Sequence, residues 1–231
     1  MRQLPLGWHW PAQQRFETFH AGEANGASVA ALRRAALETA APWVFVAGPS
    51  GSGKTHLLIA ACSAAQDAGR VAQYLSLRSR PEPDLLRDLG GSDLLALDDL
   101  DVVAGDIAAE HALFDLYNRS RAGRATLVFA AAAASSQLGL WLPDLVSRLS
   151  SAIQAPLRPL DDDERRAVLR RRAEARGIAL DEAVLDFLFS RYARDLGSLG
   201  ALLDRLDRES LAAQRRITVS FLRALLGSEG D

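Results

Sequence analysis

The chain has 231 residues, of which 48% are hydrophobic and 24% are charged, and its formal net charge at pH 7 is −2. This composition is typical of a globular protein with one large domain or a medium domain and a small companion, and the charge excludes a general attraction to nucleic acid or anionic membranes. The single cysteine, Cys62, excludes an internal disulfide and a cysteine metal cluster, and we expect a cytoplasmic protein. The sequence shows no signal peptide and no apolar run of about 18 residues, so we expect no membrane contact.

The amino-terminal third of the chain leads into a glycine-rich motif. Residues 1–26 predict an extended, irregular segment with prolines and scattered aromatics, and an Ala- and Leu-rich stretch predicts a helix at 27–40. An apolar, β-prone strand is predicted at 43–47. It is followed by Gly48-Pro49-Ser50-Gly51-Ser52-Gly53-Lys54-Thr55, which fits the pattern G-x-x-x-x-G-K-[ST] without a mismatch. A helical pattern then runs from His56 to about residue 67.

This motif has the chemistry of a phosphate-binding loop. Its glycines let successive backbone N–H groups point inward, and the N-terminus of the following helix adds partial positive charge. Lys54 can reach the outer phosphates, and the Thr55 hydroxyl can bind Mg²⁺. A glycine-rich turn without a ligand is the alternative. The complete motif between a strand and a helix favours a nucleoside triphosphate or diphosphate.

Strands and helices alternate beyond the motif. The predicted strands are 71–77, 94–99, 125–131 and 152–157, and the predicted helices are 84–89, 107–121 and 143–149. This alternation predicts an α/β fold with a parallel sheet and helices on both faces. From residue 161 only helices are predicted, at 161–176, 181–193, 196–213 and 218–226. We therefore predict an α/β base at 27–158 and a small all-helical lid at 159–231, with a hinge at 156–160.

Two acids and one arginine are further candidate site residues. Asp98 and Asp99 follow four apolar residues at the carboxyl end of a predicted strand, where open α/β sheets bind ligands. We expect Asp98 to hold Mg²⁺ and Asp99 to orient or activate the attacking water, although acids at strand ends also serve simply to solvate loops. Arg148 lies beyond the fourth strand. It is either a surface arginine paired with an acid or a guanidinium that reaches a phosphate in a neighbouring subunit.

Five local stretches carry a more specific pattern than the loop alone. They are Gly-Lys-Thr-His-Leu-Leu (53–58), Leu-Asp-Asp (97–99), Phe-Asp-Leu-Tyr-Asn-Arg (114–119), Leu-Pro-Asp-Leu-Val-Ser-Arg-Leu (142–149) and Leu-Asp-Arg-Leu-Asp-Arg-Glu-Ser-Leu-Ala-Ala-Gln-Arg (203–215). The order of loop, acids and distal arginine is similar to an AAA+ P-loop ATPase, and these stretches narrow the resemblance to the DnaA-related Hda family.

The resemblance implies a role in chromosome replication. Members of the family pair with the replication initiator DnaA and, tethered to the DNA-loaded sliding clamp (the β subunit of DNA polymerase III), promote hydrolysis of the initiator's ATP. This activity prevents re-initiation of replication. The resemblance gives Arg148 the position of an arginine finger acting in trans, and it places the protein in the cytoplasm at the nucleoid.

The resemblance also assigns residues near the N-terminus. Gln3-Leu4-Pro5-Leu6 resembles the family's clamp-binding peptide, with a side-chain amide, two apolar anchors and a proline that favours an extended backbone. Without the family context such a short motif is a frayed terminus. Phe16, Phe19 and Asn25 precede the first helix, where the family's adenine pocket is partly built. Stacking on a base and packing against the sheet are both compatible with them.

Two positions depart from the AAA+ pattern. Ala132 stands where a polar residue should sense the γ-phosphate, and Gly197 stands where related proteins carry a phosphate-contacting arginine. Arg194, one turn earlier, is a candidate replacement at the nucleotide. His56, directly after the loop, is a further candidate nucleotide-binding residue. Because phosphoryl transfer depends on electrostatic positioning, these losses should weaken hydrolysis of the chain's own nucleotide. They favour a regulator that holds ADP or ATP with Mg²⁺.

Two other functions compete with this interpretation. An autonomous AAA+ ATPase, such as a helicase-loader-like motor, would use the same loop, but Ala132 and Gly197 argue against it. The initiator itself needs a DNA-reading domain, whereas this sequence ends at Asp231 after the predicted lid and without a basic stripe. We therefore expect no direct sequence-specific contact with DNA. The choice between ADP and ATP, and the possibility of a homo-oligomer, stay open.

Overall fold

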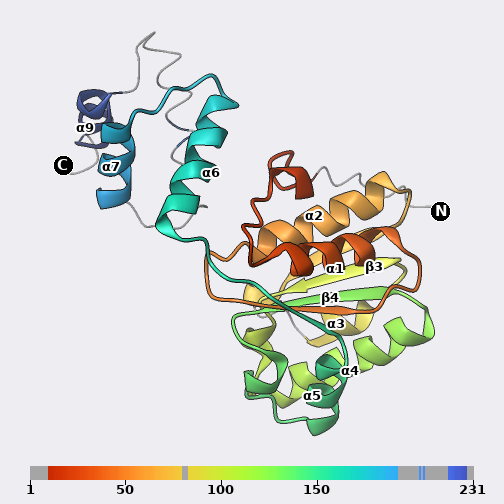
Figure 1. Cartoon of the computed structure of the whole chain (residues 1–231). Helices are drawn as coiled ribbons and strands as arrows, with labels where there is room; N and C mark the ends of the chain where they lie inside the picture. The colour runs from red at the N-terminus through yellow and green to blue at the C-terminus, as the bar shows by residue number, and fades with distance from the viewer. Residues whose placement is uncertain (1–9, 80–82, 192–202, 204, 206–217, 228–231) are drawn as a thin grey trace. The chain divides into compact units, whose positions relative to one another are not determined.

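The computed structural model describes residues 10–79, 83–191, 203, 205 and 218–227 (Figure 1). The chain divides into two compact units, Met1–Pro159 and Leu160–Asp231. The clamp-binding-like peptide Gln3-Leu4-Pro5-Leu6 and the lid positions Arg194 and Gly197 lie outside the described residues, as does most of the helix predicted at 196–213.

The first unit contains a five-stranded parallel sheet in the order β2-β3-β4-β1-β5. Its strands are β1 (Val44–Ala47), β2 (Ala72–Ser76), β3 (Leu94–Asp98), β4 (Thr126–Ala131) and β5 (Ile153–Pro156). The register pairs Val44 of β1 with Val128 of β4 on one side and with Ile153 of β5 on the other. Every residue of β3 and β4 is buried, as expected for a parallel sheet that is covered on both faces. The predicted parallel sheet is confirmed.

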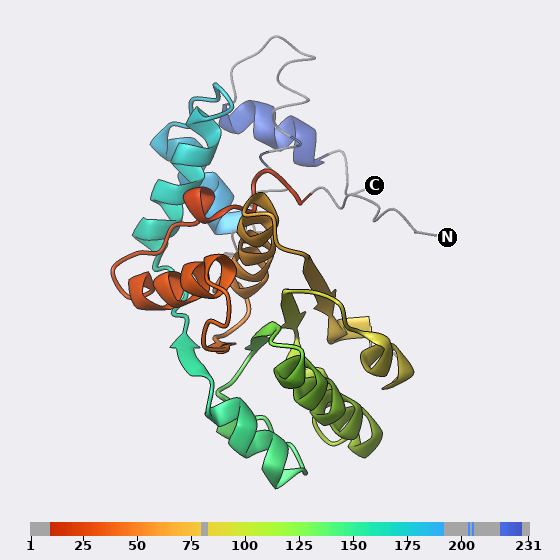
Figure 2. The ribbon, with the colours of Figure 1, turned by 90° about the vertical axis from the view of Figure 1, so that its right-hand side faces the viewer.

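Helices cover both faces of this sheet (Figures 1 and 2). On one face lie α1 (Gly26–Leu37) and α2 (Lys54–Asp67), and on the other lie α3 (Pro83–Asp88), α4 (Ile107–Ala122) and α5 (Pro143–Ser150). Successive side chains of a strand point to opposite faces. Val44 and Val46 therefore join the core beneath α1 and α2, whereas Phe45 joins the core beneath α4 and α5.

Some element ends differ from the predicted ones for local reasons. Helix α1 ends at Leu37 and not at residue 40, because the backbone is extended at Glu38, and a left-handed Ala40 with φ of 57° follows. Strand β3 ends at Asp98, since Asp99 also has φ of 57° and turns the chain away. The described part also contains four short 3₁₀ helices that the sequence patterns did not predict, namely η1 (Phe16–Thr18), η2 (Leu77–Ser79), η3 (Leu100–Val103) and η4 (Ser135–Gln137).

The described elements of the second unit are all helices, which confirms the predicted helical lid. They are α6 (Asp162–Glu174), α7 (Glu182–Arg191) and α9 (Val219–Gly227). A capping box starts α6, because the Asp161 carboxylate accepts from the Glu164 N–H (2.8 Å) and the Glu164 carboxylate accepts from the Asp161 N–H (3.0 Å). The unit has its own apolar core, which includes Leu169, Leu185 and Leu222. No helix within the described ranges has the length and apolar character needed to cross a membrane.

Candidate nucleotide site and the arginine on α5

The glycine-rich loop connects β1 to α2, and its glycines are required by close contacts. A Cβ atom on Gly48 would lie 2.6 Å from the carbonyl oxygen of Leu157, and one on Gly53 would lie 2.6 Å from a ring carbon of Phe19. Gly51 and Gly53 have φ of 79° and 91°, a backbone conformation in which a side chain is strained. The sequence pattern and the observed loop therefore agree at each glycine.

Lys54 folds back onto the loop that precedes it. Its Nζ donates to the carbonyl oxygens of Gly48 (2.6 Å) and Pro49 (3.0 Å). Burial lowers the pKa of the Lys54 ammonium from its ordinary value of 10.5, and the nearby carboxylates of Asp98 and Asp101 oppose part of this effect. The Ser52 hydroxyl is buried and has no hydrogen-bond partner among the described residues. A phosphate group fits this loop, because it would accept from both the ammonium and the hydroxyl.

Asp98, at the end of β3, accepts hydrogen bonds from three neighbouring donors. Its side chain is buried and accepts from the Thr55 hydroxyl (2.6 Å), the Tyr74 hydroxyl (3.0 Å) and the Asp99 N–H (2.9 Å). Burial, together with the charge of Asp98, raises the pKa of Tyr74, so this phenol stays a donor at neutral pH.

The Thr55 and Asp98 oxygens fit Mg²⁺. Magnesium in nucleotide sites is held by one or two carboxylates, a hydroxyl and phosphate oxygens. Within the described ranges, no group of three or more His, Cys, Asp and Glu side chains could hold a metal by itself. An ion at Thr55 and Asp98 would therefore depend on a nucleotide for further ligands, and it would neutralise part of the phosphate charge.

Asp99 is engaged in an ion pair at the end of β2. Its carboxylate accepts from the Ser76 hydroxyl (2.9 Å) and from the Arg78 guanidinium (3.1 Å). Burial by itself would raise the pKa of Asp99, but the hydrogen bonds from Arg78 and Ser76 outweigh it, and the pKa lies below the ordinary value of 3.8. A general base works best with a pKa near the operating pH. The role of Asp99 in activating water stays a prediction, and its observed contacts are those of a structural acid.

The residues before α1 have different surroundings. Phe16 is buried in the core, which favours packing over base stacking for this ring. Phe19 lies against Gly53, with its ring centroid 5.3 Å from that of His56. The Asn25 side chain donates to the carbonyl oxygen of Arg158 (3.0 Å) and accepts from its N–H (2.8 Å). Asn25 thus fastens the start of α1 to the chain beyond β5, and contacts of Phe19, His56 and Asn25 with a nucleotide stay predictions.

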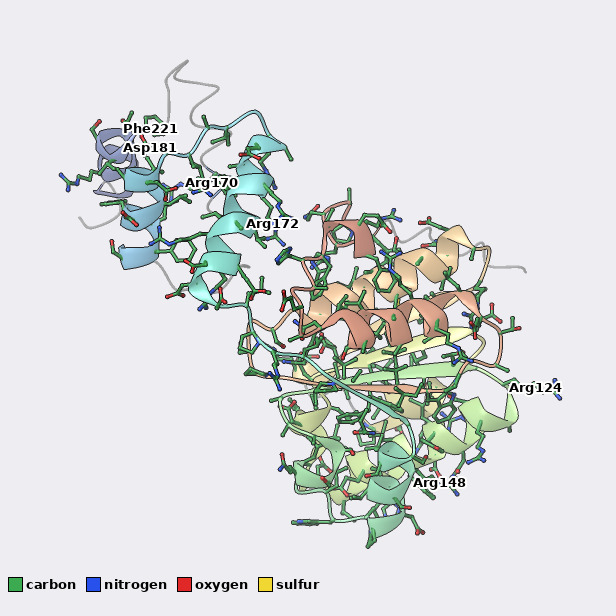
Figure 3. All side chains as sticks on the ribbon, viewed as in Figure 1. Arg124, Arg148, Arg170, Arg172, Asp181 and Phe221 are labelled. Atoms are coloured by element: carbon green, nitrogen blue, oxygen red, sulfur yellow. The ribbon has the colours of Figure 1, made fainter. Side chains whose placement is uncertain are left out.

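Arg148 lies near the end of α5, on the face of the sheet opposite to α2 (Figure 3). Its guanidinium carbon is 5.4 Å from the ring centroid of Phe114 and 5.2 Å from that of Tyr117, and both rings belong to α4. Such cation–π contacts hold a guanidinium in place without neutralising it. Within the described part of the chain, no carboxylate forms an ion pair with Arg148. The alternative of a surface arginine paired with an acid is therefore not observed there.

The sequence patterns missed several residues next to these sites. Tyr74 and Ser76 lie two residues apart on β2, beside β3, where Ser76 pairs in register with Asp98. Two hydroxyl-bearing residues with this spacing lie on the same face of a strand, and this was the available signal. Glu110 is a completely buried acid on α4 and was not singled out. At the predicted sensor position, the Ala132 N–H donates to Asp101 (3.0 Å) and the side chain offers only a methyl group.

Comparison with known proteins agrees with these features. Residues 11–157 match the family model of the bacterial DnaA ATPase domain, and residues 162–226 match the model of the Hda lid domain. The chain belongs to the DnaA-related AAA+ proteins. This DnaA-related chain thus combines an initiator-type nucleotide domain with a lid of the Hda type.

Solved structures show the same fold at low sequence identity. Domain III of the Thermotoga maritima replication initiation protein DnaA has a TM-score of 0.78 at 21% identity, over 95% of this chain and 98% of that chain. A replication initiator DnaA bound to AMPPCP and single-stranded DNA has a TM-score of 0.69 at 21% identity, over 85% of this chain. The match spans 65% of the length of that initiator. The Thermotoga maritima RuvB branch migration motor has a TM-score of 0.63 at 20% identity, over 88% of this chain and 67% of that chain.

Proposed function

We propose that this chain is a nucleotide-bound AAA+ regulator of the replication initiator DnaA. With the DNA-loaded sliding clamp, it stimulates hydrolysis of the ATP held by DnaA and so prevents re-initiation of chromosome replication. The observation that carries the proposal is the setting of Arg148, whose guanidinium rests on two aromatic rings with no described carboxylate paired to it. Such a guanidinium keeps its donors for a phosphate supplied by a neighbouring protein, as an arginine finger must. The Hda-type lid supports DnaA as that neighbour.

The chain's own nucleotide is ADP or ATP, held by the loop Gly48–Thr55. The buried Ser52 hydroxyl and the Lys54 ammonium are side-chain donors for its phosphates beside the backbone N–H groups of the loop, and Thr55 and Asp98 offer oxygens for Mg²⁺. Nucleotide binding by related initiators supports this assignment, because two DnaA structures of the same fold contain AMPPCP.

The chain binds this nucleotide but hydrolyses it only slowly. Ala132 offers no side-chain donor, and its N–H is already bonded to Asp101. Asp99 is held by Arg78 and Ser76, with a lowered pKa that makes it a weak base. We expect the purified chain to turn over ATP slowly. A rate on the order of 1 s⁻¹ or faster would favour the alternative of an autonomous motor.

The decisive experiment measures hydrolysis of DnaA-bound ATP with and without this protein and the DNA-loaded clamp. Stimulation should require both. Arg148→Ala should keep ADP binding and clamp binding but lose the stimulation, since arginine fingers contribute about 10³–10⁵-fold to phosphoryl transfer. Arg148→Lys is the matched control, because it keeps the charge and loses the planar fork, and it should recover only a small part of the rate. Stimulation at the wild-type level by Arg148→Ala would refute the finger.

A second variant tests the clamp part of the proposal. Replacing Gln3, Leu4 and Leu6 with alanine removes the amide and both apolar anchors while leaving Arg148 in place. This triple variant should no longer be retained by immobilised clamp in a pull-down. Unchanged retention would show that another segment binds the clamp.

A further inference from the structure

Helix α5, which carries Arg148, is held at both of its ends by one face of α4. With eight residues, α5 is too short to be stable by itself, so its position depends on its contacts. Glu110, Phe114 and Tyr117 are spaced i, i+4 and i+7 along α4 and therefore share a face. Glu110 contacts the backbone that enters α5, and the two rings lie against the guanidinium of Arg148 near its end.

The Glu110 carboxylate is completely buried and bonded entirely to backbone donors. Oε1 accepts from the Gly105 N–H (3.0 Å), Oε2 accepts from the Leu142 N–H (2.9 Å), and the Trp141 N–H is shared between Oε1 (3.1 Å) and Oε2 (2.9 Å). Leu142 is the N-cap residue of α5 and provides no side-chain cap of its own. Glu110 therefore accepts the N–H of the N-cap residue, one of the backbone groups without a partner inside the helix, and places negative charge at the positive end of α5.

Gly105 connects the same carboxylate to the nucleotide side of the sheet. It follows η3, which starts two residues after Asp98, and Asp101 within η3 accepts the N–H of Ala132. The buried Glu110 carboxylate thus links two segments: the chain that follows β3 and its predicted Mg²⁺ ligand Asp98, and the start of α5, which carries Arg148.

We propose that Glu110 is a positioning residue. By holding the start of α5, it fixes the Arg148 guanidinium where it can contact the partner's nucleotide. This inference rests on the proposed function of Arg148. Both carboxylate oxygens are used, so an amide of the same size cannot replace the group, because its NH₂ would face backbone N–H donors. Glu110 acts only through Arg148. A misplacement of a catalytic group by about 1 Å can reduce a rate by about 100-fold.

The test compares Glu110→Gln with the wild-type chain in the DnaA and clamp hydrolysis assay. The maximal stimulated rate should fall about ten- to 100-fold, because the guanidinium is no longer held in one place. The concentration of this protein at half-maximal stimulation should stay within about twofold of wild type, and so should its affinity for ADP. The buried Glu110 side chain is not expected to touch DnaA or the nucleotide. Hydrogen exchange should become faster at the Trp141 and Leu142 amides.

Two further variants serve as a control and as a milder change at the same position. Asp106→Asn is the matched control, because Asp106 caps the start of α4 through the Ala108 and Ala109 N–H groups (3.1 Å each) without a contact to α5. Its stimulated rate should stay near that of wild type. Glu110→Asp keeps the charge and shortens its reach, so it should fold and show an intermediate loss of rate even where Glu110→Gln is unstable.

A double variant separates positioning from general stability. In the Arg148→Ala background, Glu110→Gln should cause no further loss of rate, because it acts through the missing guanidinium. An additional loss there, or a wild-type rate for Glu110→Gln despite fast exchange at Trp141 and Leu142, would overturn the positioning role and leave the proposed function standing. Failure of the wild-type chain to stimulate DnaA would overturn both.

Discussion

Two cationic side chains of the first unit, Lys54 and Arg148, have opposite surroundings. Lys54 donates to two carbonyl oxygens of its own loop, and burial lowers its pKa while the carboxylates of Asp98 and Asp101 partly offset that effect. Arg148 lies on two aromatic rings, and no carboxylate in the described ranges pairs with it. The ammonium of Lys54 is thus held at the loop that it would share with a bound phosphate. A cation held by π faces keeps its hydrogen-bond donors for a group brought from outside.

The two sites also differ in what they require of the backbone. The loop depends on glycines with positive φ and on contacts too close for a Cβ atom. The arginine depends on two regular helices and one buried acid, Glu110, that holds the start of the second helix. The shape of the loop therefore depends on its own backbone angles and on close neighbours, whereas the position of Arg148 depends on packing between helices.

The largest expected contrast is in nucleotide affinity. Lys54→Ala should weaken ADP binding about ten- to 150-fold, because hydrogen bonds from charged groups contribute about 1.5–3 kcal/mol. Arg148→Ala should change the same affinity by less than about twofold, since it belongs to a different site. Isothermal titration calorimetry of both variants measures the difference. A comparable loss in the two variants would show that the sites are not separate.

A change in folding stability, and not in affinity, is expected from the backbone of the loop. Gly53→Ala should lower the free energy of unfolding by about 2–4 kcal/mol, because a left-handed alanine costs about 1–2 kcal/mol and the new Cβ must also displace the Phe19 ring. Gly69→Ala is the matched control, with φ of 78° and no atom within 4 Å of the added Cβ. Gly69→Ala should lower the free energy of unfolding only by the about 1–2 kcal/mol of a left-handed alanine. Urea unfolding followed by circular dichroism gives both values, and equal costs would mean that Phe19 moves aside freely.

The smallest expected effect is on the pKa of Asp99 and on the part of the stability that depends on it. The pKa of Asp99 is lowered in the folded protein, so its ionised form stabilises the fold above the ordinary pKa of 3.8, and this contribution is lost as the pH falls through the folded-state pKa. Arg78→Ala should raise the pKa of Asp99, because burial then acts with less opposition. Arg78 is 80% exposed, so solvent limits the change in stability. A ¹³C NMR titration of the Asp99 carboxyl measures the shift, and an unchanged pKa would assign the lowering to Ser76.

Much of the fold could be predicted because its determinants are local. The run Leu94–Leu97 predicts a strand buried on both faces, and the structure covers it with helices on both sides. The loop Gly48–Thr55 is one contiguous motif and could be predicted as such, although two of its glycines are also required by distant neighbours, Leu157 and Phe19. The turn at Asp99 was missed, because its carboxylate is held by Ser76 and Arg78 of another strand end.

Glu110 was missed for a related reason. Its partners are backbone N–H groups, which every residue except proline carries, and two of them lie 31 and 32 residues further along the chain. No residue type marks such partners in a sequence. Arg148 needed the family resemblance for the same reason, because its aromatic partners Phe114 and Tyr117 are ordinary core-facing residues of a helix until the packing is known.

The position of β1 inside the sheet has a consequence for how the protein is made. Its neighbours β4 and β5 come late in the chain, with Val44 pairing to Val128 and Ile153, and the Gly48 N–H donates to the Ala131 carbonyl oxygen. During synthesis the strand that leads into the loop therefore has no partner until most of the first unit has left the ribosome. We expect the nascent chain to gain nucleotide affinity only when its last strand joins the sheet, so that ligand binding reports completed folding.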